Sequence, residues 1–344
     1  MKTKRGPNPI SSTENSVDRY ASPEAKITLF RSLFRGRDDV YPRRFESRKT
    51  GKSGYQPACS NEWARSLCDK RAVKCIVCPN RRFLPVVDET FRQHLSGQDE
   101  TGRNFVMGVY PMLRDETCYF LAADFDKASW RDDVKAVMET SLQLGIPPAL
   151  ERSRSGNGGH LWWFFDQSIP AGLARKLGAH ILTETMERRP DIGLDSYDRF
   201  FPNQDTLPKG GFGNLIALPL QKHPRENGNS VFLDADFTPY PDQWVFLASL
   251  RKVTQSDVEA IVSSAISRDR VVGIPFVFDD EDDNAPWILP ASRRRNDPPI
   301  VDALPATLEL VLANQIYIAK EGLLNELTTW INYPKSSPLK SGIW

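Results

Sequence analysis

The sequence predicts an α/β (α+β) domain in which helices pack on a sheet. Strand-like and helix-like segments alternate between about residues 104 and 237, which is typical of such a core. Of the 344 residues, 40% are hydrophobic, and this length and composition are sufficient for a sizeable buried core. No internal repeat of fixed period is present, so a repeat architecture is not expected.

The first helix is expected from residue 25, because apolar side chains recur there on one helical face: Ile27, Phe30, Leu33 and Phe34. The basic stretch that follows, YPRRFESRKTGKSGY, is expected to be a loop, which is either a solvated surface or a contact for nucleic-acid phosphates. The segment FVMGVYPMLRDETCYFLAADFD then predicts two strands with a polar turn at 113–116.

Residues 130–144 have helical periodicity and stop at Gly145, before two prolines. A strand is expected in LWWFF, a helix in AGLARKLGAHILTETMERR and a strand in GNLIALPLQ. A further helix is expected in SDVEAIVSSAISRDR.

The expected organisation has four parts. Residues 1–22 form a flexible leader, 23–250 the main domain, 251–297 a helix and charged linker, and 298–344 a C-terminal helical segment. No apolar run reaches the roughly 20 residues of a membrane helix, and the first ten residues carry no apolar signal segment. A soluble, cytoplasmic protein without a membrane partner is therefore expected.

The formal net charge of +1 conceals an asymmetry. Residues 1–82 contain 19 Lys and Arg against 8 Asp and Glu, a net +11, so the remainder sums to −10. The near-neutral total therefore does not exclude nucleic acid as a partner.

Four cysteines lie within twenty residues: Cys59, Cys68, Cys75 and Cys78. Their spacing is C-x8-C-x6-C-x2-C, and thiols stay reduced in the cytosol, so a structural zinc ion held by four thiolates explains them better than disulfides do. The alternative is four unrelated buried cysteines. Basic residues surround the cluster and predict a surface that faces nucleic acid: Lys70, Arg71, Lys74, Arg81 and Arg82.

The apolar segment YFLAADFD ends in Asp124 and Asp126. Alternate residues of a strand share a face, so the two carboxylates converge, and Mg²⁺ or Mn²⁺ would neutralise them. An ordinary surface turn is the alternative interpretation of this pair.

The segment SRSGNGGHLWWFF follows about one β–α unit later. Glycines let backbone amides approach phosphates and hydroxyls add donors, so His160 is a candidate contact for a phosphate or for a neighbouring acid. A histidine with a purely structural role is the alternative. Ser155, Gly158 and Gly159 are the candidate phosphate-binding residues of the turn.

A two-metal site needs a further carboxylate, and the segment before GNLIALPLQKH supplies four candidates: Asp191, Asp195, Asp198 and Asp205. A surface loop with solvated acids is the alternative.

The order DFD, SGNGGH, then FPNQ and GNLIALPL resembles the archaeo-eukaryotic primase superfamily, the primase-polymerases. The fuller wording, including RRFLPV after the cysteines and ERSRSGNGGHLWWFF, resembles the primase domain of TOTE conflict systems. The resemblance covers about residues 25–250. It implies a catalytic core with an RRM-like sheet and helices over 23–250, together with a small N-terminal zinc-binding module at 59–78.

The resemblance implies roles for individual residues. Asp124 and Asp126 correspond to the metal-binding acidic pair, His160 to the histidine that contacts the incoming nucleotide, and Asp198, or alternatively Asp195, to the third acid. Asn214 and Lys222 match positions that bind the nucleotide in related primases. The residue two before His160 is glycine where the superfamily often has serine, so a backbone amide would replace a hydroxyl there.

The function that the resemblance implies is DNA-templated nucleotidyl transfer, as a primase or polymerase, with two Mg²⁺ or Mn²⁺ ions and a structural Zn²⁺. The partners are a single-stranded or primed DNA template and an NTP or dNTP. Such proteins typically carry a fused helicase, which this sequence does not contain although ANQIYIAKEGL is similar to the entry to one. The chain is therefore expected to be a truncated form, an excised part or a stand-alone variant, with a helicase as a candidate partner. The residues alone also allow a metal-dependent nuclease, or a zinc-containing nucleic-acid-binding module without catalysis.

Overall fold

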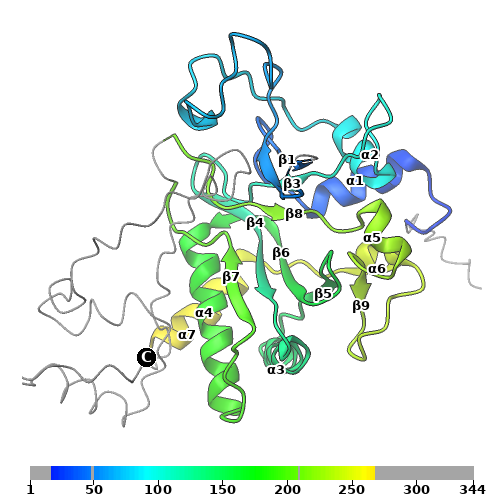
Figure 1. The fold of residues 1–344 in the computed structure, drawn as a ribbon. Coiled ribbons are helices and arrows are strands. Elements are labelled where there is room, and N and C mark those ends of the chain that lie inside the picture. Colours follow the sequence, from blue (N-terminus) through cyan, green and yellow to red (C-terminus); the bar gives the residue numbers. More distant parts are fainter. Residues whose placement is uncertain (1–16, 48–49, 208–209, 268–344) are drawn as a thin grey trace, which may run out of the picture.

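A five-stranded antiparallel sheet lies at the centre of a mixed α+β fold (Figure 1). The computed structural model describes residues 17–47, 50–207 and 210–267. The strand order is β7-β4-β6-β5-β9. The strands are β4 (Thr117–Phe125), β5 (Ala149–Arg152), β6 (Gly159–Pro170), β7 (Tyr197–Phe201) and β9 (Phe232–Leu233). The predicted α+β class is confirmed.

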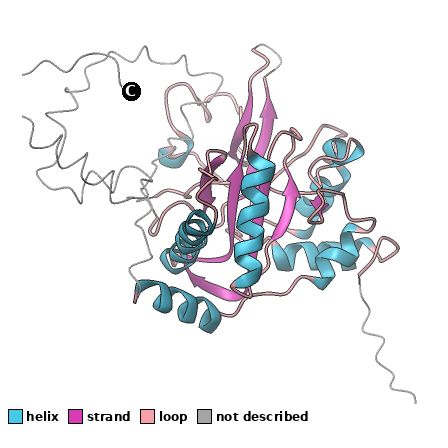
Figure 2. Ribbon diagram, turned by 90° about the horizontal axis from the view of Figure 1, so that it is seen from below, coloured by secondary structure: helices cyan, strands magenta, loops and turns pink. Residues whose placement is uncertain are grey.

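Helices pack on both faces of the central sheet (Figures 1 and 2). On one face, α4 (Ala171–Arg188) approaches so closely at Gly178 that a Cβ there would lie 2.6 Å from the Phe200 ring. The neighbouring helix on this face is α3 (Trp130–Gln143). The other face meets the end of α1 (Pro23–Leu33), where the Phe34 ring lies 5.1 Å from Trp162 and 5.4 Å from Phe164. This second face carries the candidate active site.

Burial on both faces explains the unbroken apolar run of β6. Trp162 and Phe164 point toward α1, whereas Leu161 and Trp163 alternate with them and point toward the opposite layer. A strand covered on both faces has no polar alternation, which is the pattern of LWWFF.

The expected helices are present at α1, α3, α4 and α7 (Gln255–Ile266). Local signals place two of their starts: the Ser22 hydroxyl accepts a hydrogen bond from the Ala25 N–H, and Thr254 caps α7 in the same way. The structure adds α2 (Asp88–Ser96), α5 (Lys222–Glu226), α6 (Gln243–Ser249) and a 3-10 turn, η1 (Cys75–Val77).

Two expectations for the strands need correction. The basic stretch expected to be a loop contains a hairpin of β1 (Pro42–Glu46) and β2 (Ser53–Pro57). The two strands expected in 104–126 both exist, but β3 (Gly108–Val109) pairs with β8 (Ile216–Ala217) and not with β4. The partners β3 and β8 are distant in sequence and leave no local signal, so the pattern could not assign this ladder.

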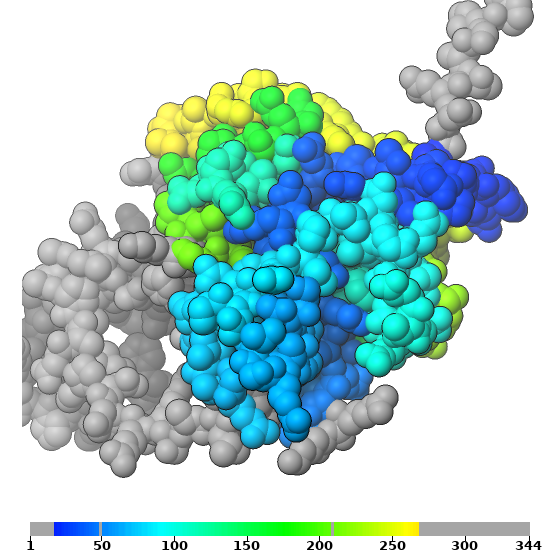
Figure 3. Space-filling view, turned by 90° about the horizontal axis from the view of Figure 1, so that it is seen from above, coloured from blue at the N-terminus to red at the C-terminus, as the bar shows by residue number. Residues whose placement is uncertain are grey.

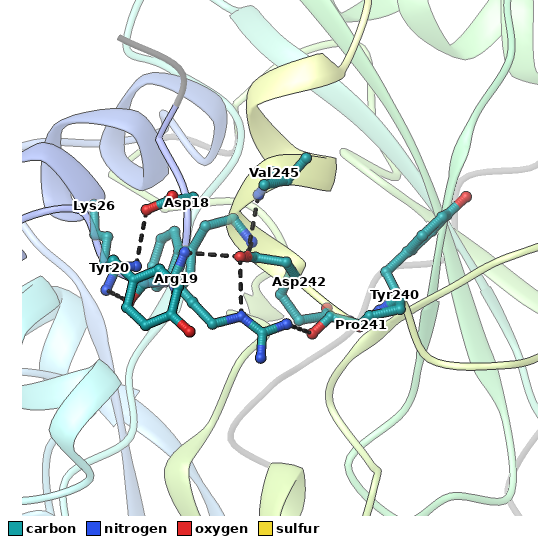
Figure 4. A network of polar contacts seen from close by, with 10 residues as sticks. Asp18, Arg19, Tyr20, Lys26, Tyr240, Pro241, Asp242 and Val245 are labelled. Carbon is teal, nitrogen blue, oxygen red and sulfur yellow. Dashed lines mark hydrogen bonds and ion pairs between the residues drawn. The ribbon is translucent and has the colours of Figure 1, made fainter.

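Arg19, which the sequence assigns to the leader, is hydrogen-bonded to residues of α1 and to the residues just before α6 (Figure 4). The backbone N–H of Arg19 donates to the carboxylate of Asp242 at 2.8 Å, and its guanidinium donates to the same oxygen at 3.3 Å. Lys26 donates to the carbonyl of Arg19 at 2.6 Å. Asp242 also caps α6, so one carboxylate joins the start of the described chain to this helix.

The parts expected at 1–16 and from 268 onward, including most of the charged linker and the C-terminal helical segment, lie outside the described residues. None of the helices in the described ranges has the length and apolar character that crossing a bilayer requires.

Candidate active site

The acidic pair lies at the end of β4. Asp124 is in the strand and half-buried, while Asp126 follows the last strand residue and is exposed. The backbone N–H of Asp126 donates to the carbonyl of Ser196 at 2.8 Å, which ties the strand end to the start of β7. The predicted strand therefore ends between the two acids, and the convergence of their carboxylates stays a prediction.

Three charged residues stand side by side across three neighbouring strands. In the register of the sheet, His160 of β6 is opposite Asp124 of β4 on one side and opposite Glu151 of β5 on the other. The Nε2 atom of His160 lies 3.4 Å from Oδ1 of Asp124, and its Nδ1 lies 3.0 Å from Oε2 of Glu151. The predicted neighbourhood of histidine and acid is therefore present, with a second acid that the sequence did not predict.

Glu151 is the least exposed member of this row, since only 2% of its side chain is accessible. Its Oε2 also accepts a hydrogen bond from Trp162 Nε1 at 3.1 Å, and its Oε1 lies 3.4 Å from the hydroxyl of Ser230. A buried carboxylate needs such partners, because an unpaired charge in the interior is costly.

The electrostatics of the row favour positive charge on the ring. Burial alone would lower the pKa of His160, but the carboxylates of Glu151 and Asp124 raise it to about 9. Burial is also the main reason why the pKa of Asp124 is raised; Asp198 and Asp126 raise it further, and His160 opposes them. Asp124 therefore lies where additional positive charge would be favourable.

Of the two candidates for the third acid, Asp198 lies beside Asp124 in the sheet, and its role stays a prediction. Ala123 pairs with Phe200 and Phe125 with Tyr197, so Asp198 and its neighbour together stand opposite Asp124. This irregularity is a β-bulge, which re-aims side chains locally.

Asp198 forms an ion pair with Arg199 at 2.6 Å, and both residues act on the pKa of Asp124. Asp195 is exposed and precedes the strand, and its carbonyl accepts a hydrogen bond from Lys127. The other two candidates have arginine partners, Asp191 with Arg189 and Asp205 with Arg175.

The donor set of this site is chemically suited to Mg²⁺ or Mn²⁺, which prefer carboxylate oxygens. Burial is the main reason why the pKa of Asp124 is raised and repulsion from Asp198 and Asp126 adds to it, and a bound cation would favour the ionised carboxylate against both effects. Across the described ranges, however, no three His, Cys, Asp or Glu side chains lie close enough together to hold a metal ion as they stand. Metal binding by Asp124, Asp126 and Asp198 therefore stays a prediction.

The glycine turn packs directly on the end of β4. A Cβ at Gly158 would lie 2.4 Å from the carbonyl oxygen of Phe125, and one at Gly159 would lie 2.8 Å from the Trp130 ring. Gly156 has a φ of +82°, which favours glycine. Each of these glycines is thus required by the fold, and contact with a phosphate stays a prediction for Gly158 and Gly159. The hydroxyl of Ser155 accepts from the N–H of Asn157 within the turn.

The two remaining nucleotide-binding candidates have other partners. Asn214 is buried, where its side chain donates to the carbonyl of Phe200 at 2.9 Å and accepts from the N–H of Asn203 at 3.2 Å. Lys222 pairs with Glu226 along α5 at 3.0 Å. Their roles in nucleotide binding stay predictions.

Two arginines that the sequence did not single out lie close to the row. Arg154 donates to the side chain of Gln221. Burial raises the pKa of the Tyr55 hydroxyl, the charges of Arg154 and Arg44 lower it, and the charge of Glu151 raises it further. Arg44 and Tyr55 are opposite one another in the β1–β2 hairpin. Glu151 could have been found from the sequence, because it is an acid that directly follows the apolar residues of the segment ALER. No local signal places the β1–β2 hairpin close to this row.

The four cysteines lie in one segment at the surface of the molecule (residues 59–78, blue to cyan in Figure 3). All four are half-buried, and η1 brings the Cys78 N–H within 3.3 Å of the Cys75 carbonyl. In the described residues their side chains do not lie close enough together to hold a metal ion as they stand, so zinc binding stays a prediction.

One residue of the basic set around the cysteines does not lie at the surface. Lys70 is 8% exposed and donates to Gln56 at 2.6 Å and to Glu62 at 3.0 Å. The expectation that Lys70 faces nucleic acid is therefore wrong, because its ammonium group joins the segment to β2. The other four basic residues are exposed.

Comparison with known proteins places this fold in a family. No curated protein sequence matches the chain. Among solved structures, it is similar to a polymerase domain from Mycobacterium tuberculosis Ligase D in complex with DNA, with 11% sequence identity, a TM-score of 0.33, and coverage of 72% of this chain and 89% of that chain. The family model of the archaeo-eukaryotic primase domain of the TOTE conflict system matches residues 25–261, which is more than half of the chain. The chain belongs to this TOTE archaeo-eukaryotic primase family.

Proposed function

We propose that this chain catalyses DNA-templated nucleotidyl transfer, adding a nucleotide from an NTP or dNTP to a 3′ hydroxyl. The observation that carries the proposal is that Asp198, Asp124 and His160 lie beside one another on three neighbouring strands. Membership of the primase family supports nucleotidyl transfer in general. This reaction requires positioning and charge neutralisation more than covalent chemistry by the protein.

Asp124, Asp126 and Asp198 are the residues proposed to hold two Mg²⁺ or Mn²⁺ ions. When bound, such ions would activate the attacking 3′ oxygen and stabilise the charge of the leaving pyrophosphate. His160 would contact a phosphate oxygen through its Nε2 edge, which faces Asp124. The exposed hydroxyl of Ser155 would add a donor beside it.

The template is proposed to contact the cysteine-bearing segment (Figure 3). Arg71, Lys74, Arg81 and Arg82 are exposed there, and the ring of Trp63 is 60% exposed. Cations attract the phosphate backbone, and an exposed aromatic ring offers a surface on which a base can stack. Binding through these residues should weaken as salt concentration rises.

The test uses a labelled NTP or dNTP, a primed or unprimed single-stranded DNA template, and Mg²⁺ or Mn²⁺. The expected result is extension or a new primer with the wild-type protein and none with the double variant Asp124→Asn and Asp126→Asn. Asp132→Asn, which changes an exposed acid in the first turn of α3, is the matched control and should retain activity.

The same assay separates the alternatives. A metal-dependent nuclease would shorten the DNA without added nucleotide. A binding module without catalysis would leave the length of the DNA unchanged both as the wild type and as the double variant. Extension by the double variant at the wild-type rate would refute the proposal.

A further inference from the structure

We propose that Glu151 is the positioning residue of His160: its carboxylate fixes the ring and the Nδ1 proton, so that Nε2 is held toward Asp124. The importance of this for nucleotide binding rests on the proposed function, whereas the orientation of the ring does not. The sequence motifs DFD and SGNGGH do not include Glu151, which reaches His160 from the neighbouring strand.

The geometry leaves the Nδ1 atom one partner in the described structure. Oε2 of Glu151 is 3.0 Å from Nδ1 of His160 and 3.1 Å from Nε1 of Trp162. An indole N–H can only donate, so Oε2 acts as an acceptor for Trp162, and a second donor, the Nδ1–H of His160, completes its bonding. With Nδ1 bonded to Glu151, the ring turns its Nε2 edge toward Asp124, whose Oδ1 lies 3.4 Å away.

Glu151 is itself held from several sides. It is 2% exposed, its backbone is paired with both β6 and β9, and the Ser230 hydroxyl lies 3.4 Å from Oε1. The indole and imidazole rings meet nearly at right angles, at 85° with centroids 6.2 Å apart. A carboxylate with so little freedom can orient a ring, as buried carboxylates orient histidines in other polar sites.

Two substitutions separate the positioning role from general stability. Glu151→Gln can keep the hydrogen bonds, because its amide oxygen can accept from both rings while its NH₂ donates to the Ser230 hydroxyl. Glu151→Met is close in shape and removes every acceptor. Glu184→Met is the matched control, since Glu184 is a largely buried acid of α4, on the opposite side of the sheet, that pairs with Arg188.

The first measurement needs no substrate. The chain has four histidines, so ¹⁵N-histidine labelling and a His160→Gln spectrum identify the signals of this ring. A protected Nδ1–H is expected in the wild type, Glu151→Gln and Glu184→Met, and loss or rapid exchange of this proton is expected in Glu151→Met. An Nδ1–H signal that is unchanged in Glu151→Met would overturn the proposal.

The second measurement is the KM for the nucleotide in the extension assay. A charge-assisted hydrogen bond that is lost by misorientation corresponds to about a tenfold rise in KM for Glu151→Met, against less than about threefold for Glu151→Gln. A purely structural residue would lower the melting temperature of Glu151→Met without this difference in KM, and that result would also overturn the proposal.

Two further outcomes are informative. If Glu151→Met does not fold, Glu151→Asp takes its place, because it withdraws the carboxylate by one methylene and should also release Nδ1; a retained Nδ1–H in that variant would contradict the proposal. If no variant and no wild-type protein extends DNA, the proposed function fails, while the spectra still decide whether Glu151 orients His160.

Discussion

Gly158 offers a direct test of how the glycine turn supports the acidic pair. A methyl group at this position would lie 2.4 Å from the carbonyl oxygen of Phe125 and 3.3 Å from Cα of Asp126. A comfortable carbon–oxygen contact is about 3.3 Å, so Gly158→Ala forces the turn and the strand end apart by about 1 Å. The backbone at Gly158 is not left-handed, so this contact is the main cost.

The expected result is a loss of both stability and activity. Overpacking of this size lowers the free energy of unfolding by about 1–3 kcal/mol. A shift of about 1 Å at catalytic carboxylates costs about a hundredfold in rate. Urea denaturation measures the first effect, and the primer-extension rate of the folded protein measures the second.

Gly172→Ala is the control for this substitution. Gly172 lies in the first turn of α4, and a Cβ there would meet only the Asp205 side chain at an ordinary 3.4 Å. Alanine should therefore be tolerated or mildly stabilising at this position. A Gly158→Ala protein with the unfolding free energy and extension rate of the wild type would refute the packing argument.

Three further predictions concern stability and metal. Burial lowers the pKa of His94 to about 4 from 6.5, so only the unfolded chain gains a proton between these values and stability falls as pH drops through this window, by about 2 kcal/mol at pH 5. Urea titrations of His94→Gln should lack this part of the acid sensitivity, and an equal pH dependence in both proteins would contradict it. Asp133 is buried and accepts from the N–H of Ser196 at 3.1 Å and from its hydroxyl, so Asp133→Ala should cost about 2–4 kcal/mol in urea and speed hydrogen exchange at the start of β7; unchanged exchange would count against this anchor. Reduced protein should bind one Zn²⁺ per chain and lose it on Cys75→Ser with Cys78→Ser, as measured by metal analysis, and a wild-type content well below one ion would contradict the zinc prediction.

The helices and the acidic strand could be predicted because their signals are local. An apolar stripe, a capping hydroxyl and a terminating glycine specify α1 and α3 within a few residues. The run before Asp124 is long and apolar enough to specify β4 as a buried strand, and the position of the acid at its end follows.

Features that depend on contacts with other parts of the structure could not be predicted in this way. The segments PRRFE and SGYQP have little apolar character, so the β1–β2 hairpin has the sequence of a solvated loop. The charge of Lys70 likewise predicts exposure. Its burial depends on the hydrogen bonds to Gln56 and Glu62, which offset the cost of removing the ammonium group from water.

The candidate site shows why the register carries information that motifs lack. Asp198, Asp124, His160 and Glu151 come from β7, β4, β6 and β5, and they are neighbours because each strand is paired in one particular register. A shift of one residue in β5 would move Glu151 to the opposite face and leave His160 Nδ1 without its acceptor. The bulge in β7 also decides which face a side chain occupies. In a regular strand Asp198 would be opposite Phe125 and would point toward α4, whereas the extra residue of the bulge brings Asp198 toward Asp124. Two features that no short motif encodes, a strand register and a bulge, therefore supply the acids on either side of the pair formed by Asp124 and His160.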